Sequence, residues 1–223
     1  MRYCCLRQLG RVDYARALQL QQQLAADRKR GLVPDQLLLL EHPHVITMGR
    51  NGHLENLLAG DDILARAGIG YYPTDRGGDV TYHGPGQLVG YPILDLREWK
   101  RDVGAYVRAV EETLIATLAE YGIEAGRIPK LTGVWVGERQ GGTQAKIAAI
   151  GVHLSRWVTS HGFALNVSTD LSYFQYIVPC GLTRPVTSMA ALGVRASLPE
   201  VGAKLAVHFA RIFDCRMLPE SEN

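Results

Sequence analysis

The amino-acid sequence predicts an α+β fold in which helices pack against a mixed β-sheet. Helical patterns over residues 103–121 and from Ser197 to about Phe213 enclose a long region of strand patterns joined by short turns. Hairpin-connected strands with helices set apart from them are typical of α+β proteins and differ from the alternation of a doubly wound parallel sheet. No linker, internal repeat or low-complexity tract divides the chain, so we expect residues 1–223 to form a single domain.

The region before residue 100 combines two helical patterns with apolar runs of strand length. Asp13 is a suitable N-cap for a helix that Gly31 ends, and Gly68 stops a shorter helical pattern. Continuous short apolar runs bounded by turns are typical of buried strands. The expected elements are helices at 13–30 and 61–67 and strands at 37–40, 45–48, 69–73 and 88–94.

The region after residue 100 begins with the most regular helical pattern in the chain. Apolar residues from Val103 to Tyr121 recur at helical spacing, and Gly122 follows as a terminator. Residues 197–200, Ser-Leu-Pro-Glu, combine a capping box with a proline in the first turn, which marks the start of the last helix. Between these helices we expect a hairpin of strands 133–137 and 146–154 around a turn at 139–142, then a strand at 161–167.

Composition and charge are those of an ordinary globular protein. Of the 223 residues, 47% are hydrophobic and 21% are charged, and the formal net charge is +2. A nearly neutral chain has no overall field that attracts nucleic acid or a membrane surface, so neither partner is expected. The basic clusters at 28–30 and 97–101 fit solvated helix ends, and a docking patch for an acidic partner is the alternative.

The sequence indicates neither export nor a metal site. Residues 1–10 lack the apolar core of a signal peptide, and no apolar run is long enough to span a bilayer, so we expect a soluble cytoplasmic protein. The four cysteines lack the Cys-x-x-Cys spacing of zinc sites, and no third ligand accompanies His42 and His44. We expect free thiols in a reducing compartment, and neither a metal nor a cofactor.

The segment from Arg76 to Gln87 is the most informative feature, with the sequence Arg-Gly-Gly-Asp-Val-Thr-Tyr-His-Gly-Pro-Gly-Gln. Four glycines and a proline in twelve residues are unsuited to a packed core, and glycine lets main chain approach a ligand or another segment closely. The spacing differs from that of phosphate loops and dinucleotide fingerprints. We expect a ligand-contacting loop before a buried strand, and a tight turn without a ligand is the alternative.

Cys180 is the cysteine best suited to chemistry. It lies between Pro179 and Gly181, on kinked backbone with little side-chain cover. Such exposure suits a nucleophile, although many loop cysteines have no role. An unperturbed thiol is only about 3% thiolate at pH 7, so a working nucleophile needs a neighbouring cation or base.

Lys146 and His83 are the candidate activators of Cys180. Lys146 stands in an otherwise apolar strand, where desolvation favours the neutral amine as a base, while the ammonium form stabilises a thiolate. A lysine on the solvent face of an edge strand is the alternative. His83 lies in the glycine-rich segment, either as a second possible base or as a structural residue that hydrogen-bonds this loop.

Together these segments resemble the lipoyl(octanoyl) transferase family, whose members move an octanoyl group from acyl carrier protein to a lysine of lipoyl domains. Residues 76–92 resemble the long glycine motif of that family. Three further segments match in the same order: Glu41-His42-Pro43 with Thr47-Met48-Gly49-Arg50, then Lys146 to Val152, then Pro179-Cys180-Gly181-Leu182. The resemblance extends from about residue 35 to residue 190.

The resemblance implies a cysteine nucleophile at Cys180, an activating lysine at Lys146, and a fold akin to the catalytic module of biotin and lipoate ligases. The acyl-binding residues that it implies are Arg76, Gly77, Gly78, Asp79, Val80, Thr81, Tyr82, His83, Ala149, Ile150, Gly151, Gly162, Phe163 and Ala164. Phe163 is bulky between its neighbours, so we expect it to shorten or reshape the acyl tunnel. The implied partners are octanoyl-acyl carrier protein and the lipoyl domains of 2-oxoacid dehydrogenase complexes and of the glycine cleavage protein.

Two other classes of function stay open. A lipoate or biotin ligase would share the fold, would need ATP to form an acyl adenylate, and would not need Cys180. A non-enzymatic acyl-binding or carrier-docking module would bind octanoyl groups reversibly, but it has no chemical reason to pair Lys146 with Cys180. We therefore expect acyl transfer in two steps through a thioester, without ATP.

Overall fold

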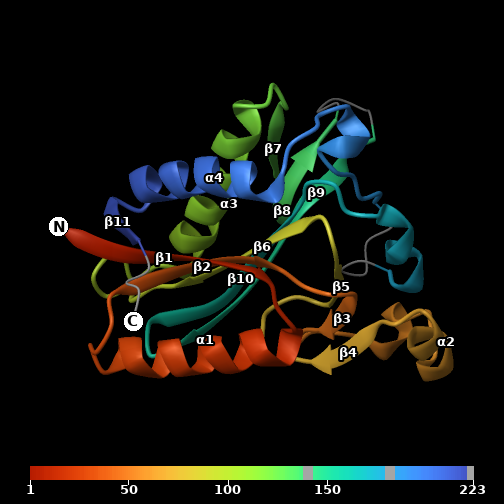
Figure 1. Ribbon diagram of the computed structural model, residues 1–223, viewed down its shortest axis with the longest axis horizontal. Coiled ribbons are helices and arrows are strands. Elements are labelled where there is room, and N and C mark those ends of the chain that lie inside the picture. The colour runs from red at the N-terminus through yellow and green to blue at the C-terminus, as the bar shows by residue number, and fades with distance from the viewer. Residues whose placement is uncertain (138–142, 179–183, 220–223) are drawn as a thin grey trace.

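A mixed β-sheet forms the centre of the computed structural model, which describes residues 1–137, 143–178 and 184–219 (Figure 1). Within these ranges eight strands pair in the order β11-β1-β2-β6-β10-β9-β8-β7, with β1 parallel to both β11 and β2 and the other pairs antiparallel. The strands are β1 (Arg2–Arg11), β2 (Asp35–Glu41), β6 (Gln87–Ile93), β7 (Ala125–Ile128), β8 (Leu131–Val136), β9 (Ala145–Ser155), β10 (Val158–Asn166) and β11 (Cys215–Pro219).

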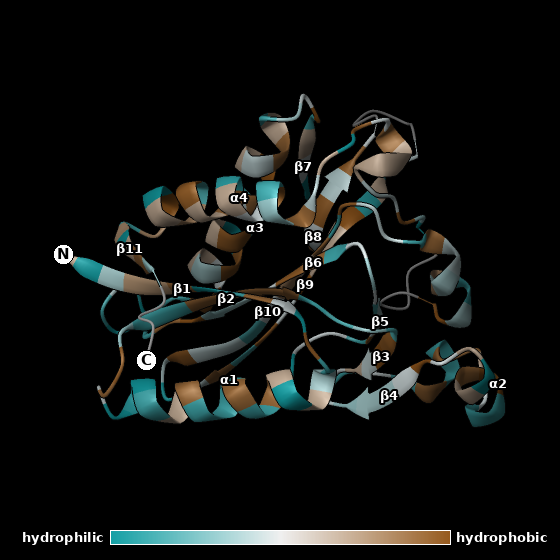
Figure 2. Cartoon of the chain, in the orientation of Figure 1, coloured by the Kyte–Doolittle hydropathy of each residue, from teal (hydrophilic) through white to brown (hydrophobic). Residues whose placement is uncertain are grey.

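Helices cover both faces of this sheet (Figure 1). Helix α1 (Tyr14–Lys29) packs on one face against β6 and β10, whereas α3 (Val103–Ala119) and α4 (Leu198–Ile212) pack against each other on the opposite face. Hydrophilic and hydrophobic residues are interspersed along α1, as expected for a helix with one exposed side (Figure 2).

A smaller sheet lies beside the N-terminal end of α1. It has the order β4-β3-β5, formed by β4 (Gly70–Pro73), β3 (Val45–Met48) and β5 (Val80–His83). The short helices α2 (Asp61–Arg66), η1 (Leu54–Asn56) and η2 (Leu171–Tyr176) accompany it, and η4 (Ala190–Leu192) precedes α4. Apolar side chains from β3, β5, α2 and η2 form a separate small core around this sheet.

The run of four leucines in β2 shows why the sequence forms a central strand. Leu37 and Leu39 belong to the core beneath α3 and α4, while Leu38 and Leu40 belong to the core beneath α1. Side chains alternate between the two faces of a strand, so a strand covered on both faces needs apolar residues at every position.

The α+β class with a mixed sheet is confirmed, and most predicted elements are present. The capping box at Ser197 forms as expected, with both reciprocal hydrogen bonds to Glu200. Asp13 is the N-cap residue of α1 but makes no side-chain capping bond. Four strands were not predicted: β1, β5, β7 and β11, of which β5 lies within the segment expected to be a loop. The predicted turn at 139–142 lies outside the described residues.

Asp35, at the start of β2, joins three parts of the fold through one buried carboxylate. It is 2% exposed and accepts hydrogen bonds from Arg28 Nε of α1 at 2.8 Å, from the Asp95 backbone N–H at 2.9 Å, and from Arg2 of β1. Arg28 is therefore buried in an ion pair, which corrects the expectation that the cluster at 28–30 is simply a solvated helix end.

Among the residues that the structure describes, no helix is both long enough and apolar enough to cross a membrane.

Replacing Asp35 by alanine should lower the free energy of unfolding by about 3–5 kcal/mol, because it leaves two guanidinium groups in or near the core without their shared carboxylate. Urea unfolding followed by circular dichroism measures the change. Asp62→Ala is the matched control, since it removes the exposed ion pair with Arg66 and should leave stability nearly unchanged. Equal losses in the two variants would contradict the role assigned to Asp35.

Candidate active site

The glycine-rich segment packs main chain against main chain. Gly77 N–H donates to the carbonyl of Val152 on β9 at 2.8 Å, and Arg50 N–H donates to the carbonyl of Arg76 at 2.9 Å. A Cβ placed on Gly151 would lie 2.8 Å from the Gly77 oxygen, which is closer than real contacts allow. The segment therefore needs glycine for close approach, as predicted, and part of that approach is to other segments of the chain.

Two charged side chains fix the shape of this segment. The guanidinium of Arg76 is buried and donates to the hydroxyl and the carbonyl oxygen of Thr47, the latter at 2.6 Å. Asp79 is also buried, and its carboxylate accepts from the backbone N–H groups of His53 and Val80 and from the Asn56 amide. The loop is thus held by charged hydrogen bonds to β3 and η1, rather than by apolar packing.

A cavity beside this loop brings together most of the predicted acyl-binding residues. Its walls come from the loop, β5, β9 and β10, and they include Arg76, Gly78, Thr81, His83, Ala149, Ile150, Gly151, Gly162, Phe163 and Ala164. Four predicted residues are not part of its lining: Gly77, Asp79, Val80 and Tyr82. Gly77 and Asp79 hold the loop, while Val80 and Tyr82 belong to the core of the small sheet.

Three further residues line the cavity and were not predicted as binding residues: Tyr14, Tyr91 and His161. They come from the first turn of α1, from β6 and from β10. All three side chains are buried, but they come from separate elements, so the sequence carries no signal that groups them. Tyr91 and His161 are also each held by a hydrogen bond, to His42 and to Asp75 respectively.

Phe163 lines the cavity but projects its ring into the core beneath α3 and α4. The ring fills the space above Gly90, where an added Cβ would lie 2.0 Å from the Phe163 Cζ atom. The neighbouring Ala164 belongs to the opposite core, beneath α1. A bulky residue is thus accommodated between Gly162 and Ala164 because Gly90 leaves room on the partner strand.

Burial keeps the imidazoles around the cavity neutral. Burial lowers the pKa of His42 to about 4 and, with a smaller effect of His42 itself, lowers the pKa of His83 to about 3. His42 donates from Nδ1 to the Val12 carbonyl at 2.7 Å, so its Nε2 accepts from the Tyr91 hydroxyl at 2.8 Å. His83 donates from Nδ1 to Gln87 at 2.8 Å. With so low a pKa, His83 accepts a proton poorly at pH 7, which favours Lys146 as the base.

Lys146 lines a smaller cavity that adjoins the first. Thr81, Ala149 and Ala164 form walls of both cavities, so the two are direct neighbours. The lysine is 7% exposed, and its ammonium nitrogen lies 4.8 Å from the centroid of the Trp135 ring. Lys146 is thus a buried residue at the end of the glycine-lined cavity, not a solvent-facing lysine of an edge strand.

The segment that carries Cys180 lies outside the described residues, but hydrogen bonds fix both of its flanks, and Val186 of the second flank lines the cavity of Lys146. On one side, Val178 N–H donates to the Asn56 carbonyl at 2.8 Å. On the other side, Lys146 N–H donates to the Pro185 carbonyl at 2.9 Å and Thr187 N–H donates to the Lys146 carbonyl at 2.9 Å. The chain that follows this segment therefore pairs directly with the strand of Lys146.

A pair of buried side-chain amides connects the glycine-rich segment to the chain that follows the Cys180 segment. The Gln87 amide donates to the side-chain oxygen of Asn166 at 2.9 Å, and the Asn166 amide donates to the Thr187 carbonyl at 3.0 Å. Because Gln87 also accepts from His83, one chain of hydrogen bonds runs from the glycine-rich segment to the strand partner of Lys146. Such a network orients its members only when every group is satisfied, as here.

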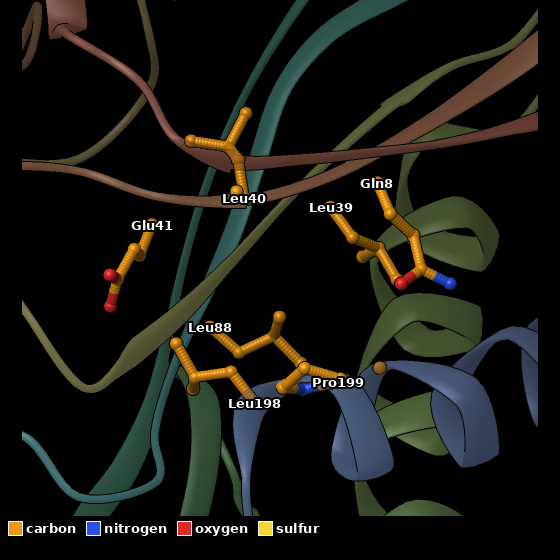
Figure 3. A pocket seen from close by; sticks show the side chains of 9 residues that line it. Gln8, Leu39, Leu40, Glu41, Leu88, Leu198 and Pro199 are labelled. Atoms are coloured by element: carbon orange, nitrogen blue, oxygen red, sulfur yellow. The ribbon is translucent and has the colours of Figure 1, made fainter.

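A larger cavity of about 200 Å³ lies on the other side of the sheet, between β1, β2, β6 and the start of α4 (Figure 3). Its walls are mainly apolar, with Leu39, Leu88 and Leu198 prominent (Figure 3). Its carboxylate, Glu41, is engaged by Arg11 and by the Gly86 backbone N–H. None of the predicted site residues lines it, and its side chains offer neither a nucleophile nor a free base.

Comparison with known proteins gives three findings. The model of the lipoyl protein ligase A/B catalytic domain family matches residues 13–210. An octanoyltransferase from Solibacter usitatus is 81% identical over 219 residues, which cover 98% of this chain and 97% of that protein. Two solved structures share the fold at low identity. A lipoate protein ligase from Thermoplasma acidophilum with bound lipoic acid has a TM-score of 0.78 and 19% identity, with 100% of this chain and 90% of that chain covered. A biotin protein ligase from Aquifex aeolicus has a TM-score of 0.53 and 13% identity, with 94% of this chain and 69% of that chain covered.

The buried histidines predict a loss of stability in mild acid. Because the pKa values of about 4 and 3 lie below the ordinary value of 6.5, the unfolded chain takes up protons first as the pH falls. The two neutral imidazoles make their full contribution to the free energy of unfolding above about pH 6.5. That contribution is lost as the pH falls toward 4 for His42 and toward 3 for His83. Urea unfolding should show a loss of about 2 kcal/mol for each histidine between pH 7 and pH 5.

The variant His42→Gln should remove about half of this pH dependence. His53→Gln, which replaces an exposed imidazole, is the matched control. An unchanged slope in His42→Gln would contradict the assignment.

Proposed function

The chain is an acyltransferase of the lipoyl protein ligase A/B catalytic domain family, and we propose that it transfers an octanoyl group from octanoyl-acyl carrier protein to a lysine of lipoyl domains. The transfer passes through a thioester on Cys180 and is the first step of attaching lipoate made by the cell. The observation that carries the proposal is that the glycine-lined cavity ends at Lys146, whose strand pairs with the chain flanking Cys180.

The first step moves the acyl group onto the protein. Lys146 Nζ accepts the proton of the Cys180 thiol, and the thiolate attacks the thioester carbonyl at the end of the phosphopantetheine arm. The bond between the carbonyl carbon and the carrier sulfur breaks, and the carrier leaves as a thiol that takes the proton back from Lys146. Backbone N–H groups of the glycine-rich segment hold the carbonyl oxygen as its charge develops, and one such donor contributes about 3 kcal/mol.

The second step moves the acyl group to the target. The amine of the lipoyl-domain lysine attacks octanoyl-Cys180, Lys146 takes a proton from the amine, and Cys180 leaves with that proton. Thioester and amine become thiol and amide, so atoms and charge balance without ATP. An amide is more stable than a thioester, which makes the step favourable.

The cavity lined by Gly78, Ala149, Gly151 and Ala164 receives the octanoyl chain. Its volume of about 40 Å³ exceeds the roughly 15 Å³ that one water requires, but it is smaller than an eight-carbon chain. Binding therefore widens it. The acyl carbonyl then lies toward Lys146, at the narrow end.

The proposed setting follows from this chemistry. The acceptors are the lipoyl domains of 2-oxoacid dehydrogenase complexes and of the glycine cleavage protein, and the reaction takes place in the cytoplasm, where a nucleophilic cysteine stays reduced. Residues 1–223 act as a single catalytic domain. A ligase of the same fold would instead activate free octanoate with ATP. Product formed from octanoyl-acyl carrier protein without ATP supports transfer, whereas a strict need for ATP supports the ligase.

Octanoyl-acyl carrier protein should add a single octanoyl group to the native protein, as measured by intact-protein mass without ATP. Added lipoyl domain should discharge this adduct and gain the same mass. Cys180→Ser should show neither change, since a hydroxyl is a far weaker nucleophile than a thiolate. Cys215→Ser, at a half-buried cysteine away from the cavity, is the control and should behave as native. Octanoylation of the lipoyl domain by Cys180→Ser at the native rate would reject the thioester.

Lys146→Ala should slow acylation of Cys180 by about two to four orders of magnitude, the usual contribution of a positioned base. Rapid-quench mass measurement of the octanoyl adduct gives the rate, and circular dichroism checks that the fold is kept. Lys100→Ala, at an exposed lysine remote from the cavity, is the control. Near-native acylation by Lys146→Ala would refute the assigned role.

A further inference from the structure

A second cavity lies behind the glycine-lined cavity, and His161 stands where the two meet. This second cavity, the α1 cavity, has a volume of about 250 Å³ and lies between α1, β9, β10 and Asp75. Among the described residues, only His161 lines both cavities. The lining of the α1 cavity includes the exposed Gln22 and the half-exposed carboxylate of Asp75, so this cavity reaches the surface.

The backbone of His161 brings its side chain to this position. Phe163, two residues along β10, belongs to the core beneath α3 and α4, and strict alternation would place His161 on the same face. His161 instead has a φ of 55°, in the left-handed region that residues other than glycine rarely adopt, and its side chain lines the α1 cavity. Its backbone N–H donates to the Gln21 side-chain oxygen at 2.8 Å. A strained residue of this kind persists only where its surroundings hold it, and such residues cluster at functional sites.

The imidazole of His161 is held as a partition between the two cavities. On one side the Tyr91 ring lies nearly perpendicular to it, with the ring centroids 6.4 Å apart. On the other side Nε2–H donates to the Asp75 carboxylate at 2.7 Å, because a carboxylate can only accept. Tyr91 lines the glycine-lined cavity and Asp75 lines the α1 cavity. The imidazole, 3% exposed, is therefore fixed from both sides, in part by a charge-assisted hydrogen bond.

This partition lies at the end of the glycine-lined cavity that is remote from Lys146. The walls shared with the cavity of Lys146 are Thr81, Ala149 and Ala164, and His161 is not among them. On β10, His161 and Ala164 are three residues apart, which is about 10 Å along a strand. That distance is comparable with the length of an extended chain of eight carbons. Because the acyl carbonyl lies toward Lys146 in the proposed reaction, the methyl end of the chain points to His161.

We propose that His161 sets the upper limit on the length of the acyl chain. The inference rests on the proposed function, since it concerns the acyl group that the cavity receives. An octanoyl chain ends against the imidazole, whereas a longer chain has to displace it and break its hydrogen bond to Asp75. Without the imidazole the two cavities join. The additional methylene groups of a longer acyl thioester then extend into the α1 cavity, where Leu18, Ala25 and Val158 offer apolar contact.

A competition among acyl-acyl carrier proteins with eight, ten, twelve and fourteen carbons tests the proposal. The products on the lipoyl domain are quantified by intact mass, and their ratio compares the substrates in one reaction, so a change in overall rate cancels. For the native protein we expect octanoyl to be preferred over dodecanoyl by at least about 100-fold. In His161→Gly, which adopts the left-handed backbone without strain, the preference should fall below about tenfold.

Three further variants make the result specific. His153→Ala is the matched control, because His153 Nε2 also lies near the Asp75 carboxylate, at 3.5 Å, but His153 lines the α1 cavity alone. Its preference should stay native. His161→Asn, which tolerates the left-handed backbone and keeps a shorter polar side chain, should give an intermediate preference. Adding Ser160→Phe to His161→Gly refills the α1 cavity from β10 and should restore the octanoyl preference, which a general loosening of the loop would not do.

The outcomes separate this inference from the proposed function. Octanoyl transfer by the native protein, with an unchanged preference in His161→Gly, overturns the role of His161 and leaves the proposed function intact. An equal shift in His153→Ala also overturns it, because the effect would then come from Asp75 and the loop. Circular dichroism checks each fold, and His161→Asn carries the test if His161→Gly does not fold.

A native protein that transfers no acyl group would reject the proposed function, and the cavity can then be tested alone. Isothermal titration calorimetry with octanoate and dodecanoate measures binding without any reaction. The native protein should bind octanoate only, and His161→Gly should bind both acids. Any other pattern overturns the role of His161.

Discussion

Contact between glycine backbones is the constraint on which the arrangement of the site depends. Three crossings of the chain leave no room for a Cβ: Gly49 against Gly78, Gly151 against Gly77, and Gly162 against Gly90, with added atoms at 2.2, 2.8 and 2.1 Å from the facing carbonyl oxygens. The first two contacts hold the glycine-rich segment against the end of β3 and against β9, and the third holds β10 against β6. A larger residue at any of them would separate main chains that also donate hydrogen bonds across the gap.

Electrostatics divides the site into a neutral part and a cationic part. Around the cavity, burial keeps His42 and His83 uncharged, and their protons are committed to Val12 and Gln87. At the far end, Lys146 and Arg184 bring positive groups to the ring of Trp135. An acyl thioester has an apolar chain and a carbonyl that becomes negative during attack, so its two ends suit the two parts of the site.

Much of the fold and of the candidate site could be predicted from the sequence, because the helices carry strong end signals and the site loops are rich in glycine. Strands β1 and β11 escaped prediction because they have mixed burial and gain their apolar contacts only by pairing with each other and with β2. Arg28 was expected in solvent because a carboxylate seven residues along the chain cannot be recognised as its partner before the fold is known. Tyr14, Tyr91 and His161 were missed for the same reason, since three separate elements bring them to one cavity.

The parallel pairing of β1 with β11 has a consequence for how the molecule is assembled. Arg2 faces Cys215 in this pair, so the first strand of the chain completes its hydrogen bonds only with one of the last. Contacts between residues so distant in sequence are costly in loop-closure entropy and form slowly. During synthesis β1 leaves the ribosome early and has an open edge until β11 has been made. We therefore expect completion of the sheet at β11 to be a late event in folding, with the open edge of β1 as the surface most exposed to mispairing until then.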